Sequence, residues 1–196
     1  MGDATEDRKK AQNYAEGDVL GILYAQHARI RDLFAEVKEA AGDERAELFA
    51  ELRALLVAHE TAEEMIVRPI VTDAGGKDVA DARNAEEAEA TEVLDELDGL
   101  DVSDADFDRL LASLEASVDA HAEAEESDEF PLLEKSCSEE QRLGMGRMFR
   151  VVETIAPTRP HPSTAGSPVA QYAVGPIASL VDHARDAVSK VLPGRS

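Results

Sequence analysis

A chain of 196 residues with an apolar fraction of 43% can bury one globular core, so the sequence predicts one main domain with appendages. Its formal net charge of −22 excludes binding to nucleic acid or to an anionic membrane through the overall electrostatic field. With one cysteine, the chain can form neither an internal disulfide nor a thiolate metal cluster.

The first 18 residues are polar and lack the apolar stretch of a signal peptide. Elsewhere no segment approaches the roughly 18 apolar residues of a membrane-spanning helix. We therefore expect a soluble, cytoplasmic protein. Residues 1–16 are expected to be disordered or frayed, because they carry little to bury.

Two long helices are expected next, with apolar residues recurring every three or four positions. The first runs from a cap at Asp18 to about Ala41, and the second from about Glu44 to Val67, where Pro69 is expected to stop or kink it. Their inner stripes comprise Leu20, Leu23, His27, Ile30, Phe34 and Val37, then Leu48, Leu52, Leu55, His59, Glu63 and Ile66.

A third helix is expected at about residues 79–97, with one or both of Glu86 and Glu87 on its inner face. A fourth helix, capped by Ser103 or Asp104, is expected to break before Pro131. Its stripe comprises Phe107, Leu111, Leu114, Val118, His121 and Glu125. Since no segment shows strand alternation, the sequence predicts an all-α fold, an up-down-up-down four-helix bundle with additional C-terminal helices.

The C-terminal third differs in character. A short helix is expected at residues 139–155, a proline-rich strap at 156–176 and an amphipathic helix at 177–192. The predicted division is therefore a flexible N-terminus at 1–16, the bundle at 17–136 and an extension at 137–196. Cys137 is interpreted as an incidental loop thiol, and His161 and His183 as surface residues.

Three histidines lie on the apolar stripes of different predicted helices: His27, His59 and His121. His59 with Glu63, and His121 with Glu125, have the spacing His-x-x-x-Glu, so each pair points from one helix face. A lone histidine on such a stripe is more often a satisfied core residue. Burying three imidazoles and two carboxylates, however, is costly unless metal ions compensate.

Antiparallel packing places these polar positions at one level of the bundle, together with Glu86 or Glu87. A nitrogen and carboxylate donor set without thiolate favours iron or manganese, and less specifically zinc. Glu63 and Glu125 are the expected bridges between two ions, because they come from different helices with a histidine beside each.

The segments QHARIRDLF around His27, HETAEE from His59 and HAEAEESDEFPLL from His121 resemble the hemerythrin-like proteins with the His-His-Glu cation-binding domain. The resemblance covers about residues 18–134 and implies a non-haem di-iron centre, that is, two iron ions, in a four-helix bundle. The ligands it implies are His27, His59, Glu63, Glu87, His121 and Glu125.

The third helix departs from the family pattern, since Ala85-Glu86-Glu87 stands where a segment resembling Ala-Glu-His is common. Glu87 then replaces an imidazole, although Glu86 stays open as the ligand. With a carboxylate at this position, the chain is similar to a bacterial branch of the hemerythrin-like proteins that is known in mycobacteria and associated with peroxide breakdown. Tyr24, one turn before His27, is interpreted as a buried neighbour, a second-shell donor or a phenolate ligand.

These features together predict a di-iron protein that decomposes hydrogen peroxide in a catalase-like or peroxidase-like reaction. The alternatives are an oxygen or nitric-oxide binding or sensing protein, and an iron-storage or structural bundle. The expected partners are these small oxygen species, with the chain a monomer or homodimer. Glu64, Glu86 and Glu126, which flank the proposed ligands, are interpreted as solvated.

Overall fold

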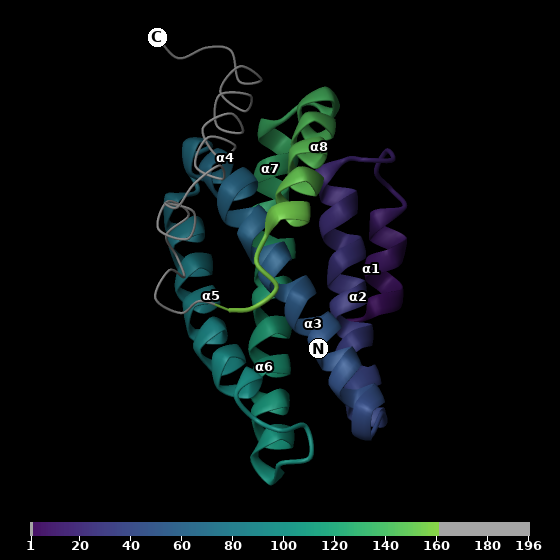
Figure 1. Ribbon diagram of the computed structural model, residues 1–196. Helices are drawn as coiled ribbons and strands as arrows, with labels where there is room; N and C mark the ends of the chain where they lie inside the picture. Colours follow the sequence, from purple (N-terminus) through teal and green to yellow (C-terminus); the bar gives the residue numbers. More distant parts are fainter. Residues whose placement is uncertain (1, 161–196) are drawn as a thin grey trace.

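Eight α-helices and two π-helical turns form the part of the chain that the computed structural model describes, residues 2–160 (Figure 1). Within these residues there is no strand, and the predicted all-α class is confirmed. The helices are α1 (Ala4–Ala11), α2 (Val19–Glu39), α3 (Gly42–Ala62), α4 (Arg68–Asp73), α5 (Lys77–Asp98), α6 (Ala105–Ala124), α7 (Phe130–Ser136) and α8 (Glu139–Ile155), and the π turns are η1 (Glu63–Val67) and η2 (Glu125–Glu129).

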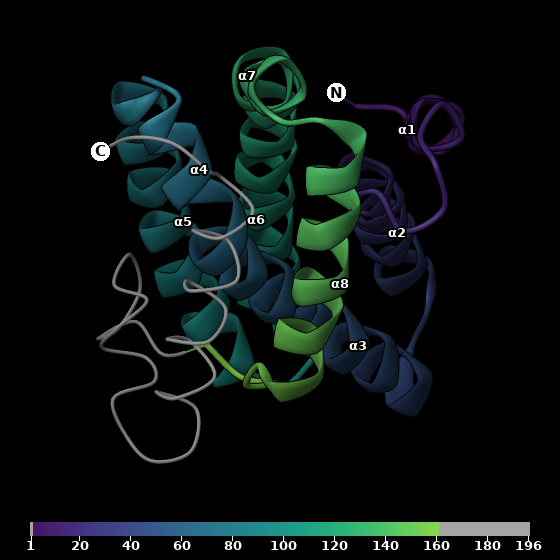
Figure 2. The same cartoon turned by 90° about the horizontal axis from the view of Figure 1, so that it is seen from above.

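The bundle is built from α2, α3, α5 and α6, which pack side by side (Figures 1 and 2). Asp18 caps α2 by accepting a 3.0 Å hydrogen bond from the Leu20 N–H, and Asp104 caps α6 in the same way through Asp106 N–H. A short side-chain acceptor of this kind satisfies an N–H that the first helical turn leaves unpaired. Both caps agree with the predicted helix starts.

The chain stays helical across both prolines, so the break expected before Pro131 is absent and, of the stop or kink expected at Pro69, the stop does not occur. Before each proline, at Glu63–Val67 and Glu125–Glu129, the chain forms a π turn and then continues as α4 or α7. In these turns the Arg68 N–H donates to the Glu63 carbonyl and the Phe130 N–H donates to the Glu125 carbonyl. Because proline's ring clashes with the carbonyl of the preceding turn, a wider turn lets the helix run on.

The N-terminus is helical and packed, whereas the sequence predicted disorder or fraying. Asp3 caps α1 by accepting a 2.8 Å hydrogen bond from the Thr5 N–H, and Asp7 is 1% exposed and paired with Arg31 of α2. Lys10 donates a 2.6 Å hydrogen bond to Glu126 at the start of the second π turn. Long-range ion pairs, which local composition does not reveal, therefore hold α1 against the bundle.

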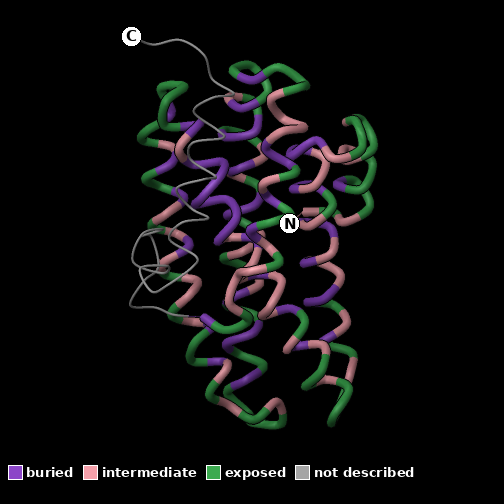
Figure 3. The backbone as a smooth tube through the Cα atoms, turned by 45° about the horizontal axis from the view of Figure 1, so that its top comes forward, coloured by how far each residue is buried: buried purple, intermediate pink, exposed green. Residues whose placement is uncertain are grey.

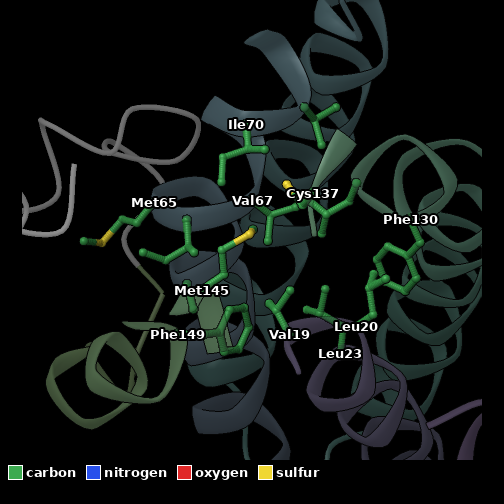
Figure 4. Packing of buried hydrophobic residues seen from close by; sticks show 14 of the residues in the cluster. Val19, Leu20, Leu23, Met65, Val67, Ile70, Phe130, Cys137, Met145 and Phe149 are labelled. Carbon is green, nitrogen blue, oxygen red and sulfur yellow. The ribbon is translucent and has the colours of Figure 1, made fainter. Parts of the chain in front are cut away.

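Two separate apolar clusters fill the core, and the interior positions of the helices are the buried ones (Figure 3). The upper cluster contains Val19, Leu20, Leu23, Met65, Ile66, Val67, Phe130, Leu133, Met145, Phe149 and Val152, among others (Figure 4). The lower cluster contains Ile30, Leu33, Phe34, Val37, Phe49, Leu52, Leu56, Leu94, Leu97, Phe107, Leu110, Leu111 and Leu114.

The predicted short helix exists as α8, and it covers the upper cluster from outside α2 and α3 (Figure 2). Its Met145 and Phe149 are buried, and a Cβ added at Gly146 would lie 2.0 Å from the Gly17 carbonyl oxygen, so only glycine allows this approach. Cys137 lies in the loop between α7 and α8, as predicted, but it is 5% exposed and belongs to the upper cluster.

The predicted helix at 177–192, most of the strap, His161 and His183 lie outside the described residues. Each helix within residues 2–160 is too short or too polar to cross a bilayer.

Candidate metal centre

A polar layer crosses the bundle between the two apolar clusters. Along α2, the residues before His27 belong to the upper cluster and those after it to the lower one, while α3 reverses this order around His59. Glu87 lies between Ala80 and Leu94 on α5 in the same way. The antiparallel helices thus bring their polar positions to one level, as the sequence argument expected.

All six predicted site residues meet in this layer, in two overlapping groups of potential metal ligands. One group is His27, His59, Glu63 and Glu125, and the other is Glu60, Glu63, Glu87 and His121. Within each group the ligand atoms lie within 4.8 Å of one another, and Glu63 belongs to both. The arrangement matches two neighbouring cation sites joined by a carboxylate.

Glu125 also reaches toward both groups. One of its oxygens lies 3.3 Å from His27 Nε2 and the other lies 3.1 Å from His121 Nε2. A carboxylate placed between imidazoles of different groups can contribute to both sites. The predicted bridging positions are therefore the two carboxylates with the most central geometry.

Glu60 is a member that the sequence analysis missed. It precedes Glu63 by three residues, so the two side chains share a face of α3, and its Oε2 lies 3.7 Å from His121 Nε2. The spacing was a usable signal, but it was hidden among the many glutamates of an acidic chain. With Glu60 and Glu87, the second group has three carboxylates and one imidazole.

In each histidine of the layer, the ring nitrogen Nδ1, which points away from the centre, has a hydrogen-bond partner. The pairs are His27 Nδ1 with Glu126 at 3.0 Å, His59 Nδ1 with Gln26 at 2.8 Å and His121 Nδ1 with Glu86 at 2.9 Å. Outer partners of this kind fix the ring orientation and aim Nε2 at the centre, which is the usual environment of a metal-binding histidine.

The interpretation of the flanking glutamates as solvated is wrong for Glu126 and Glu64, whereas the Glu86 side chain is 42% exposed. The Glu126 side chain is 10% exposed, held by Lys10 on one side and His27 on the other. Glu86 is the partner of His121 and of Arg83, whereas Glu87 is 4% exposed and belongs to the second ligand group. Glu64 is also buried, at 5% exposure.

Several buried polar atoms of the layer have no hydrogen-bond partner. They are Nε2 of His27 and His121, both oxygens of Glu63, and Oε2 of Glu60, Glu87 and Glu125. An unsatisfied buried polar atom costs about 1–3 kcal/mol, so such a concentration calls for a compensating ligand. Nitrogen and carboxylate donors converging without thiolate fit iron or manganese, so the residues suit the group that the sequence predicted.

Burial dominates the titration of the layer. It raises the pKa of Glu63 well above its ordinary value, with the charge of Glu125 adding to the effect, and it lowers the pKa of His59 to about 3. Burial would also raise the pKa of Glu125, but the charge and hydrogen bond of His121 bring it well below the usual range. Since a carboxyl must lose its proton to bind a cation, metal uptake here is coupled to proton release.

Tyr24 lies on α2 one turn before His27 and belongs to the upper cluster. Its ring stacks on Tyr14 and meets Phe130 edge-on, with centroids 6.1 and 5.0 Å apart. Burial raises the pKa of its hydroxyl, which disfavours the phenolate form. The geometry therefore agrees with the interpretation of a buried neighbour.

We expect Glu126→Ala to weaken iron binding about 10–100-fold, the range found when the outer partner of a metal-binding histidine is removed. The variant frees His27 Nδ1 and also releases Lys10 of α1. Competition with a chelator measures the change. Glu123→Ala, an exposed position near the end of α6, is the control, and equal iron affinity in the two variants would contradict the role given to Glu126.

A small pocket reaches the carboxylate-rich side of the layer. Its volume is about 50 Å³, and Glu60, Glu64 and Glu87 are among the residues that line it. Apolar residues of α3, α5 and α6 also line it, together with Pro157, Arg159 and Pro160. Since one water needs about 10–15 Å³ on this measure, the space suits a few waters or one diatomic molecule or peroxide.

The sequence is similar to known proteins that share this kind of domain. Residues 18–133 match the model of the hemerythrin HHE cation binding domain. An uncharacterized hemerythrin-like protein of Schizosaccharomyces pombe is 26% identical over 182 residues, which cover 91% of this chain and 90% of the relative. No solved structure matches the chain.

Proposed function

Because the chain belongs to the hemerythrin HHE cation-binding domain family, we propose that it is a di-iron protein that decomposes hydrogen peroxide. One observation carries the proposal: two groups of nitrogen and carboxylate donors overlap at Glu63 inside the bundle. Each iron would have one group as its ligands, with Glu63 and Glu125 between them. Two bound irons would supply the electron exchange that peroxide decomposition requires.

The side chains around the centre orient the imidazoles, exclude bulk water and leave access for a small molecule. The outer acceptors Glu126, Gln26 and Glu86 hold the imidazoles in place, while the two apolar clusters keep bulk water from the ends of the layer. The pocket beside Glu60 and Glu87 gives a small molecule access to the carboxylate-rich group. Its size favours peroxide, oxygen or nitric oxide over a larger organic substrate.

The carboxylate excess of the second group supports redox turnover over oxygen carriage. Anionic ligands stabilise the ferric state, whereas reversible oxygen binding needs an accessible ferrous pair. The same feature supports placing the chain near the mycobacterial branch, in which a carboxylate replaces the third-helix histidine. We place this activity in the cytoplasm.

Iron analysis and gas evolution test this function together. Protein expressed with iron should contain about two irons per chain, absorb in the near ultraviolet and release oxygen gas from hydrogen peroxide. A stable, reversible oxygen or nitric-oxide adduct without gas release would favour the binding or sensing alternative. Iron-supplemented protein without bound transition metal would refute the di-iron proposal.

We expect Glu87→His to lower peroxide turnover and to favour oxygen binding. The substitution removes one negative charge from the carboxylate-rich group, so the diferrous state becomes easier to reach. Optical spectra with and without oxygen, and the rate of gas release, measure the two effects. Glu89→His on the same helix is an exposed control, and identical spectra for the Glu87 variant and the native protein would exclude Glu87 as a ligand.

A further inference from the structure

A buried guanidinium lies against the ligand carboxylates. Arg68 is 4% exposed, and its Nη2 donates to Glu87 and, at 2.8 Å, to Glu125, while Glu63 lies 3.7 Å away. Its Nη1 donates a 2.6 Å hydrogen bond to Glu129. The proposed ligand set therefore shares three of its carboxylates with one arginine.

The π turn explains how Arg68 reaches this position. Five residues of an ordinary α-helix cover about 500°, which would leave Arg68 about 140° around the helix from Glu63. The π-helical hydrogen bond joins the Arg68 N–H to the Glu63 carbonyl, so the turn is wider and the two side chains face the same layer. Pro69 follows directly, which links this geometry to a feature of the sequence.

The Arg68 guanidinium bonds only one carboxylate oxygen of Glu87 and one of Glu125, so the other oxygen of each stays available to a metal ion. Glu87 and Glu125 each give Oε1 to Arg68, while Oε2 of each is buried without a hydrogen-bond partner. Each carboxylate thus keeps one oxygen that the arginine does not hold, while its Oε1 lies between Arg68 and His121 Nε2, at 3.1 Å from this nitrogen for Glu125 and 3.7 Å for Glu87. Arg68 and a metal can therefore be bound at the same time.

The charge balance of the layer indicates that the Arg68 guanidinium stays in place when metal ions are bound. The two ligand groups and Glu129 contain five carboxylates, Glu60, Glu63, Glu87, Glu125 and Glu129. Two divalent ions and one guanidinium carry five positive charges, which balance these carboxylates, whereas a trivalent pair carries an excess. Glu129 lies in neither ligand group, so it serves as a dedicated partner of Arg68.

We propose that Arg68 is a positioning residue of the centre: it orients Glu87 and Glu125 toward the metals and adds a fixed positive charge that favours the divalent pair. The proposal rests on the di-iron function proposed above. It also gives the metal-free protein an internal counter-ion for its buried carboxylates, in addition to the nearby imidazole of His121.

The test compares Arg68→Met with Arg68→Lys and Glu129→Gln, and uses Arg45→Met as a control. Arg45 is a largely buried arginine at the far end of the bundle, paired with Asp108 and lying over the Phe107 ring, so its loss reports a general packing effect. Thermal unfolding is measured for metal-free and iron-loaded forms, and the midpoint potential of the iron pair is measured by redox titration.

We expect Arg68→Met to lower the Tm of the metal-free protein more than that of the iron-loaded protein, and to shift the midpoint potential downward. Arg68→Lys should restore most of the potential, because the charge remains, but less of the metal-free Tm. Glu129→Gln should shift the potential upward, because it removes a negative charge near the same guanidinium. A purely structural role of Arg68 would not shift the midpoint potential in opposite directions in Arg68→Met and Glu129→Gln.

If Arg68→Met behaves like Arg45→Met in both measurements, the role of Arg68 is refuted while the di-iron function stands. If the native protein binds no iron, the function fails, and the metal-free Tm still decides whether Arg68 stabilises the carboxylate layer. Should Arg68→Met not fold, the opposite or equal shifts of Arg68→Lys and Glu129→Gln relative to the native potential decide the role of its charge.

Discussion

Replacing Glu63 with glutamine should remove most bound iron and yet leave the metal-free protein as stable as the native chain or more stable. Glu63 belongs to both ligand groups, so an amide there disrupts both cation sites. In the metal-free protein neither of its buried oxygens has a hydrogen-bond partner, and burial already raises the pKa of the carboxyl. An uncharged amide of the same shape therefore loses only the 3.7 Å ionic contact with Arg68, and it relieves the repulsion between Glu63 and Glu125.

The iron-loaded and metal-free forms should thus respond in opposite directions. Removing one partner of a buried charge cluster costs about 3–5 kcal/mol, so the Tm of protein prepared with iron should fall clearly. Elemental analysis should find less than half the native iron. Glu47→Gln changes an exposed carboxylate of the same helix and should alter neither quantity. Full iron content in Glu63→Gln would mean that Glu63 is not a shared ligand.

A chain ending at Ser136 should lose much of its stability and associate with itself. It contains the predicted bundle at 17–136 but lacks α8, whose Met145, Phe149 and Val152 are buried in the upper cluster. Burying one such side chain contributes about 1.5–3 kcal/mol, so the three approach the total stability of about 5–15 kcal/mol of a typical domain. The uncovered apolar surface would promote association.

The same truncation should weaken iron binding. Glu153 of α8 accepts a hydrogen bond from Gln26, which in turn holds His59 Nδ1, and the Phe149 ring lies 6.4 Å from the His59 ring. Sedimentation and iron analysis measure both effects. A chain ending at Pro160 keeps every described helix and should remain unassociated and loaded with iron. A monomeric Ser136 form with native iron content would show that α8 is dispensable.

The long helices and the level of the polar layer were predictable because apolar periodicity is dense on α2, α3 and α6. Asp18 and Asp104 also behave as capping residues, as their type suggests. The same stripes identified His27, His59 and His121. Short-range periodicity therefore predicts which helix faces form the core and where that core is interrupted.

Contacts between segments that are distant in the sequence could not be predicted in the same way. The acidic composition made Glu126 look solvated, although Lys10 lies 116 residues away in sequence and forms a 2.6 Å hydrogen bond with it. No sequence pattern singled out Arg68, which precedes Pro69. A pattern based on 3.6 residues per turn cannot anticipate a π turn, so it could not place Arg68 beside Glu87.

The polar layer also has a consequence for how the protein unfolds. It divides the core into two apolar clusters that share no residue and that are linked by α2, α3 and α5, which contribute residues to both. Cations bound there would add a further link between the two halves, and amide hydrogen exchange would then slow in both halves together. Without them, we expect the two halves to open less cooperatively. The supply of metal would thereby set the cooperativity of folding and, through it, the exposure of the chain to proteases.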